Sequence, residues 1–155
     1  MGLAAGLVLI FSAFVFWSMI PRMPDQTLLI TPEVITRLEE LKPSLNFGPD
    51  GYYTGVHNPT ERSIADRRFV ELIDNLAANL PIHPSKKFVL RQISLALYQS
   101  GVWETEDRER AISLCEKIME AVGVRSSDGL LNRYVHSYPW WLISQWLAAR
   151  FEGTT

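Results

Sequence analysis

Four side chains in the C-terminal half of the sequence could carry acid–base chemistry, which needs a carboxylate or imidazole within reach of a reacting proton. They are Glu104, Asp107, Asp128 and His136. Folding could gather them in one cleft and shift their pKa values, as in a hydrolase. However, Asp107 and Asp128 occur where first helical turns are expected, and free amide groups favour a carboxylate there. We therefore favour capping roles, and we expect a protein without enzymatic activity.

Other catalytic and cofactor-binding patterns are missing from the sequence. His57, His83 and His136 each stand alone, without the close histidine, cysteine or carboxylate spacing of a zinc site. No serine lies in a Gly-x-Ser-x-Gly turn, and there is no glycine-rich phosphate loop. We therefore expect neither a metal nor a cofactor. Cys115 falls in an apolar helical pattern, which predicts a buried thiol.

An aromatic run near the C-terminus is the most unusual local composition after the N-terminal segment. Its candidate interaction residues are Tyr134, His136, Tyr138, Trp140 and Trp141. Tyrosine and tryptophan are enriched in binding hot spots and at membrane surfaces, although a small helical bundle also uses them to fill its core. Adjacent residues on a helix point in different directions, so one of the two tryptophans could face outward. Core packing is the favoured interpretation, and an interface is the alternative.

The hydrophobic pattern after residue 30 predicts a mainly all-α domain, because apolar residues recur at three- and four-residue spacings. We expect a compact bundle of about five helices, with a small β-hairpin near 45–54. The predicted helices begin near Thr31, Thr60, Ser85, Thr105 and Ser127, and a further one begins at Pro139. The first four are predicted to end near Pro43, Pro81, Gly101 and Gly123.

Composition limits the number of domains and the class of partner. The chain has 155 residues, which is enough for one domain with one core. A balance of 15 basic against 17 acidic residues argues against a nucleic-acid partner, which usually requires a strongly basic face. The hydrophobic fraction of 47% argues against a disordered chain.

The N-terminal segment predicts a membrane anchor. Residues 2–20 read GLAAGLVLIFSAFVFWSMI and carry no charge. At about 1.5 Å per residue, such a helix nearly spans the hydrocarbon core of a bilayer. A cleaved signal peptide is the rival interpretation, but no basic residue precedes the segment and no Ala-x-Ala pattern follows it. We therefore predict an anchor at 1–21, a linker at 22–30 and a helical globular domain at 31–155.

The side of the membrane on which the domain lies is weakly specified. Arg22, Arg37 and Lys42 follow the segment and no basic residue precedes it, so the positive-inside rule taken literally places the domain in the cytoplasm. The rule has little to compare here, because only Met1 lies before the segment. Both sides stay open, with a slight preference for the extracytoplasmic side that rests on what is usual for small anchored domains.

Residues 104–137 carry a resemblance to a known family. They read ETEDRERAISLCEKIMEAVGVRSSDGLLNRYVHS, with an acidic helix start and the segment SSDGLLN. This stretch resembles the C-terminal part of a family of small bacterial proteins classed as a domain of unknown function. The resemblance implies a compact helical domain. It implies no activity and no residue role, because that family has no catalytic set that could be carried over.

These observations leave three hypotheses for function. The first is an anchored module that binds a protein partner, as an inhibitor or immunity protein does. The second is a lipid- or small-ligand-associated domain whose aromatic C-terminus touches the bilayer. The third, ranked last, is a hydrolase that uses the carboxylate and histidine residues named above.

Overall fold

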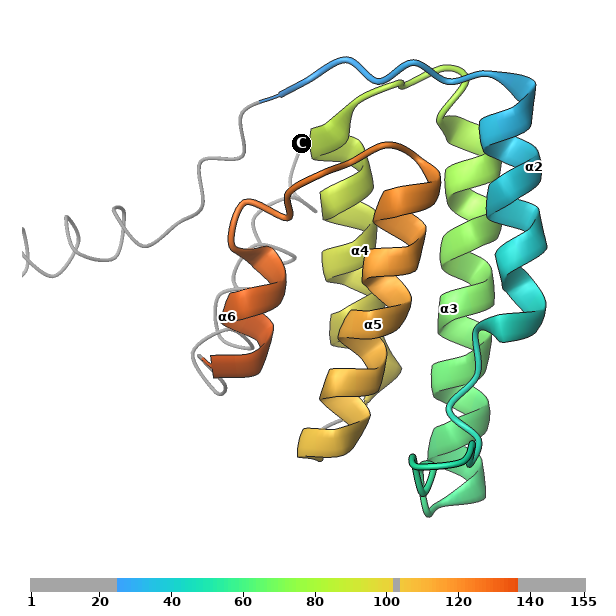
Figure 1. Ribbon diagram of the computed structural model, residues 1–155, viewed down its shortest axis with the longest axis vertical. Coiled ribbons are helices and arrows are strands. Elements are labelled where there is room, and N and C mark those ends of the chain that lie inside the picture. Colours follow the sequence, from blue (N-terminus) through green and yellow to red (C-terminus); the bar gives the residue numbers. More distant parts are fainter. Residues whose placement is uncertain (1–24, 102–103, 137–155) are drawn as a thin grey trace, which may run out of the picture.

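A computed structural model describes residues 25–101 and 104–136 of the chain. These residues form five α-helices, one 3-10 helix and no strand, which confirms the predicted mainly helical bundle. The elements are α2 (Pro32–Leu41), η1 (Lys42–Ser44), α3 (Pro59–Asn79), α4 (Lys86–Ser100), α5 (Thr105–Ala121) and α6 (Leu130–His136). Helices α3, α4, α5 and α6 alternate in direction along the bundle, as their short connections require (Figure 1).

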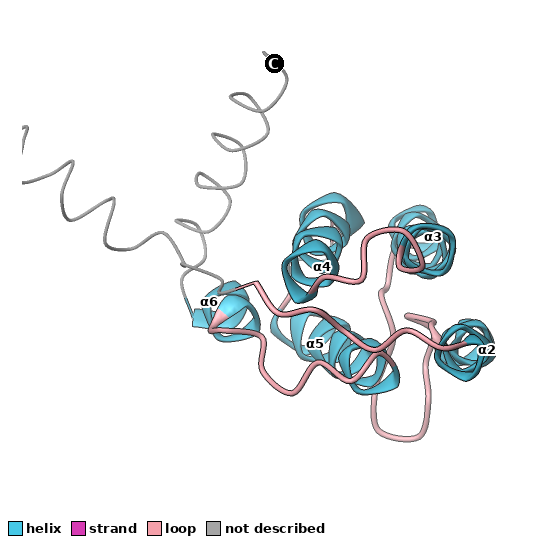
Figure 2. Ribbon diagram, turned by 90° about the horizontal axis from the view of Figure 1, so that it is seen from above, coloured by secondary structure: helices cyan, strands magenta, loops and turns pink. Residues whose placement is uncertain are grey.

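The helices lie in two layers around one core. Helices α3 and α4 form one layer, and α2, α5 and α6 form the other, with α5 between α2 and α6 (Figure 2). The core is a single cluster of buried apolar side chains contributed by all five α-helices. Phe47 and Phe69 meet edge to face in it, with ring centroids 5.1 Å apart. Cys115 is also fully buried, as predicted, and burial raises the pKa of its thiol.

Helix starts were predicted only in part. Ser85 caps α4 as expected, because its hydroxyl accepts the N–H of Phe88. The predicted cap at Thr60 is wrong: Asn58 is the cap, and its side chain accepts the N–H of Thr60. Pro59 explains the difference, since proline is favoured at the first helical position, where no N–H is needed.

The predicted hairpin near 45–54 is not formed. Within that stretch the structure has one antiparallel bridge, between Asp50 and Tyr53, and no strand. The ladder stops at this bridge, because its next rung would need the N–H of Gly48, which donates to the side-chain oxygen of Asn46 instead. The segment is therefore a loop folded on α3 and α5.

Residues 25–30, which belong to the predicted linker, lie along the loop between α3 and α4. The N–H of Leu28 donates to the carbonyl of Pro84, and the N–H of Lys86 donates to the carbonyl of Gln26. No helix among the described residues is long and apolar enough to cross a membrane. The predicted anchor and the predicted helix at Pro139 lie outside the described residues.

Candidate interaction groove

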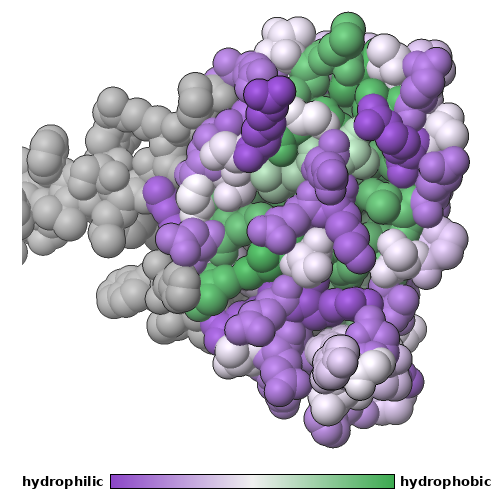
Figure 3. Space-filling view, viewed as in Figure 1, coloured by the Kyte–Doolittle hydropathy of each residue, from purple (hydrophilic) through white to green (hydrophobic). Residues whose placement is uncertain are grey.

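An open groove lies between the C-terminal half of α5 and the start of α6. Its volume is about 740 Å³. Figure 3 shows apolar surface over α6 and beside it, edged by hydrophilic side chains. The lining residues are Glu116, Met119, Glu120, Gly123, Val124, Arg125, Ser126, Ser127 and Leu131.

The end of α5 shapes one wall of the groove. The N–H of Gly123 donates to the carbonyl of Glu120, and the N–H of Val124 donates to the carbonyl of Met119. This pair of bonds is a Schellman motif, which requires a left-handed residue after the helix, and Gly123 supplies it with φ of +77°. The motif turns the chain back, so that Met119 and Val124 both face the floor of the groove.

A buried ion pair holds the loop that forms the other wall of the groove. The Nζ of Lys86 lies 2.7 Å from a carboxylate oxygen of Asp128, and only 9% and 18% of these side chains are exposed. The hydroxyl of Ser126 donates to the same oxygen and accepts the N–H of Asp128. These contacts hold Asp128 at φ of +50°, a conformation that aspartate tolerates better than most residues. The loop from 125 to 129 is thus fastened to the start of α4.

The rim of the groove is charged, whereas its floor is apolar but largely covered. Glu116 and Glu120 are exposed and lie one turn apart on the same face of α5. Arg125 is exposed on the facing loop. Met119, Val124 and Leu131 on the floor are each less than 9% exposed, so a ligand could bury little apolar area there. Charge and shape at the rim are therefore what the groove offers to a partner.

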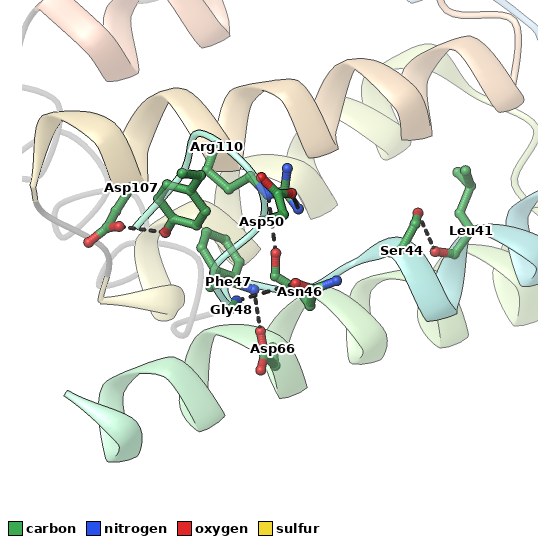
Figure 4. A network of polar contacts seen from close by, with 10 residues as sticks. Leu41, Ser44, Asn46, Phe47, Gly48, Asp50, Asp66, Asp107 and Arg110 are labelled. Carbon is green, nitrogen blue, oxygen red and sulfur yellow. Dashed lines mark hydrogen bonds and ion pairs between the residues drawn. The ribbon is translucent and has the colours of Figure 1, made fainter. Parts of the chain in front are cut away.

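A second polar network lies at the opposite end of the bundle (Figure 4). The hydroxyl of Tyr53 donates to Asp107 over 2.5 Å. The guanidinium of Arg110 pairs with Asp50 at 2.8 Å, donates to the carbonyl of Asn46 and lies 5.5 Å from the centre of the Tyr53 ring. These contacts fasten the loop before α3 to the first turns of α5. Burial, followed by the bond to Asp107, raises the pKa of Tyr53 well above its usual range. Tyr53 is therefore a hydrogen-bond donor here and is poorly suited to act as a base.

The structure does not bring all four predicted acid–base residues together, because Asp128 lies beyond the far end of α5 from the others. His136 ends α6 beside the first turns of α5, where Arg108 donates to the carbonyl of Val135. Glu104 is exposed just before α5, where it is the N-cap in place of the predicted Thr105. Asp107 is buried and bonded to Tyr53 at the start of α5, while Asp128 is paired with Lys86 beyond the other end of that helix.

The predicted capping role of Asp128 is wrong, because α6 begins two residues later and the carboxylate is used in the ion pair. Among residues 25–101 and 104–136, no three metal-binding side chains cluster.

The predicted interaction residues fall partly inside the described chain. Tyr134 is fully buried in the core cluster, so its side chain offers no free surface and agrees with the favoured interpretation of core packing. His136 is the last residue of α6. Tyr138, Trp140 and Trp141 lie outside the described residues.

The residues that shape the groove were not predicted from the sequence. The Gly123 cap was predicted, but the exposed rim formed by Glu116, Glu120 and Arg125 was not. The spacing of the two glutamates was a usable signal, because residues four apart share a helix face. No local pattern predicted the ion pair of Lys86, because its partner Asp128 lies 42 residues away.

Comparison with known proteins agrees with the helical fold and adds no activity. Among curated proteins, none matches this chain. The structure is similar to the crystal structure of a DUF3571 family protein from Acinetobacter baumannii AYE, with 30% sequence identity and a TM-score of 0.59. That match covers 74% of this chain and 94% of the other. The profile of the family described as "Domain of unknown function (DUF4844)" matches residues 29–139. The chain therefore belongs to the DUF4844 family.

Proposed function

We propose that this protein is a single-pass membrane protein whose helical domain binds a protein partner, in the manner of an inhibitor or immunity protein. The observation that carries the proposal is the stretch of nineteen uncharged residues, 2–20, placed just before a folded domain. The separation of Asp107 from Asp128 supports a binding role over a hydrolytic one. We also propose that the domain lies on the extracytoplasmic side.

The groove between α5 and α6 is the surface that we assign to the partner. Its rim presents Glu116 and Glu120 on one wall and Arg125 on the other, which suits a segment that carries at least two basic side chains. Its loop is held by the Lys86–Asp128 pair, so the rim is preorganised and little ordering entropy is lost on binding.

A small-molecule ligand is the second candidate, because a groove of about 740 Å³ is large enough for one. Small-ligand sites, however, enclose most of the ligand with apolar walls. Here the apolar floor is less than 9% exposed and the groove is open, so the charged rim would dominate binding. These features favour a protein over a small apolar molecule.

Site-specific crosslinking in cells tests the proposed groove. A photoreactive amino acid at Ser127, in the loop of the groove, should give one covalent adduct of defined mass. The same amino acid at Glu40, which is exposed on α2 on the far side of the bundle, is the matched control and should give none.

Charge reversal separates a specific contact from chance proximity. Glu116→Lys with Glu120→Lys should abolish the adduct at Ser127, because the rim then repels a basic partner. Glu40→Lys with Glu109→Lys, which changes two exposed glutamates away from the groove, should leave it intact. Equal adducts at Ser127 and Glu40, or an adduct insensitive to the rim charges, would contradict the assignment.

A further inference from the structure

Two large apolar side chains are exposed at one end of the bundle. Leu29 is 85% exposed and Ile82 is 70% exposed. Leu29 precedes α2 and Ile82 lies in the loop between α3 and α4, and these two segments meet at the top of the bundle in Figure 1. Figure 3 shows apolar surface over the same end.

This apolar end is rigid, since both segments are held by backbone bonds. The N–H of Leu28 donates to the carbonyl of Pro84 over 2.7 Å, and Thr27 forms an antiparallel bridge with Ser85. Leu28 is only 7% exposed. Because side chains alternate along extended backbone, burial of Leu28 forces Leu29 outward.

The predicted anchor joins the domain at this same end. The carboxylate of Asp25 accepts a hydrogen bond of 2.5 Å from the Ser85 hydroxyl, so the described chain begins beside the loop that carries Ile82. Ile20, the last residue of the uncharged stretch, is five residues before Asp25. Five residues span at most about 18 Å even when fully extended. A membrane-spanning helix at 2–20 would therefore hold Leu29 and Ile82 close to the bilayer surface.

We propose that the end of the domain carrying Leu29 and Ile82 docks on the bilayer, with both side chains in the interfacial layer. This inference rests on the proposed anchor. Exposed charges near this end have both signs, with Lys87 opposed by Asp25. Docking should therefore depend on apolar insertion rather than on anionic lipid, and it should persist at high salt.

Fluorescent probes on the full chain in neutral phosphatidylcholine vesicles test this orientation. The native thiol, Cys115, is fully buried, so an environment-sensitive fluorophore can be attached to Leu29→Cys or Ile82→Cys. Tyr52→Cys, at a fully exposed position in the loop at the opposite end, is the matched control. We expect blue-shifted emission and quenching by spin-labelled lipid at 29 and 82, and neither at 52.

The outcomes of the probe experiment separate the docking from the anchor. A chain that resists alkaline extraction but leaves the probes at 29 and 82 in water would overturn the docking while keeping the anchor. Probes that are shielded without being quenched by lipid would overturn the docking and show that a second copy of the chain covers this end. A chain that is released by alkali would overturn the anchor and the docking together.

Variants with the apolar surface removed give a second, independent measurement. A probe at Lys87→Cys, exposed at the same end, should be quenched by lipid in the native background and lose that quenching in Leu29→Asp with Ile82→Asp. Leu95→Asp, a change on α4 at a side chain 43% exposed, should leave the quenching unchanged. Because all three apolar positions are exposed, the fold should survive each substitution. Unchanged quenching in the double variant would contradict the proposal.

Discussion

At the scale of single residues, Tyr53 satisfies a carboxylate that is otherwise shielded from water. Asp107 is 6% exposed and accepts the Tyr53 hydroxyl. Tyr53→Phe removes this donor and should lower the free energy of unfolding by about 2 kcal/mol. Urea denaturation of the full chain in mild detergent measures the change. An unaltered value would mean that another donor replaces the hydroxyl.

The same tyrosine predicts how stability depends on pH. Burial and the nearby Asp107 raise the pKa of Tyr53 in the folded chain, whereas in the unfolded chain it should stay near its ordinary value of about 10. The contribution of Tyr53 is therefore complete below about pH 10 and is lost as pH rises above that value, because the unfolded state then gives up its proton more readily. Denaturation at several pH values from 8 upward should show this loss in the native chain and a smaller one in Tyr53→Phe.

The Lys86–Asp128 pair should show strong coupling. Lys86→Met leaves a carboxylate that is 18% exposed without its cation and should destabilise the fold by about 3 kcal/mol. Asp128→Asn keeps a side chain that tolerates positive φ, so the double variant should be much more stable than the sum of the single changes predicts. A double-mutant cycle by urea denaturation measures this coupling, and additive effects would argue against a paired site.

At the scale of elements, two glycines with similar φ values should respond differently to substitution. Gly55 has φ of +80°, and a Cβ there would lie 2.7 Å from the backbone nitrogen of Pro49. Gly123 has φ of +77° with open space around it. Gly123→Ala should cost only the strain of the left-handed conformation, about 1 kcal/mol. Gly55→Ala adds a backbone clash and should cost about 3 kcal/mol. Comparable costs would show that the loop around Gly55 can relax.

The helices could be predicted because the residues that start and stop them are neighbours in the sequence. The loop contacts and the groove could not, because they depend on residues far apart in the chain. Ser85 and Gly101 mark the two ends of α4 within their own sequence. The stretch predicted as a hairpin is instead a loop held on α3, where the N–H of Phe47 donates to Asp66, 19 residues away. The contacts of Tyr53 with Asp107 and of Lys86 with Asp128 join residues 54 and 42 positions apart. No local pattern records such pairings, so neither the loop fastening nor the groove could be derived from the sequence.

At the scale of the whole molecule, the proposed anchor, the apolar end and the groove are consistent with one orientation. Residues 25–30 and the loop with Ile82 lie at the end of the bundle where α5 finishes, and the groove begins at that end (Figure 1). A partner held at the rim would therefore sit close to the bilayer. Partners that are themselves membrane-bound would then gain effective concentration from sharing the surface.

The proposed orientation depends on residues 2–20, which must stay on the chain and hold it in the membrane. Intact cells that express the protein with a C-terminal tag test this through three readouts: alkaline extraction of the membranes, the mass of the recovered chain, and digestion of the tag by external protease. We expect a full-length chain that remains in the membrane fraction and whose tag is cleaved from outside. A protected tag would move the domain to the cytoplasmic side while keeping the anchor. A shortened chain released into solution would rule out the anchor and the orientation that depends on it.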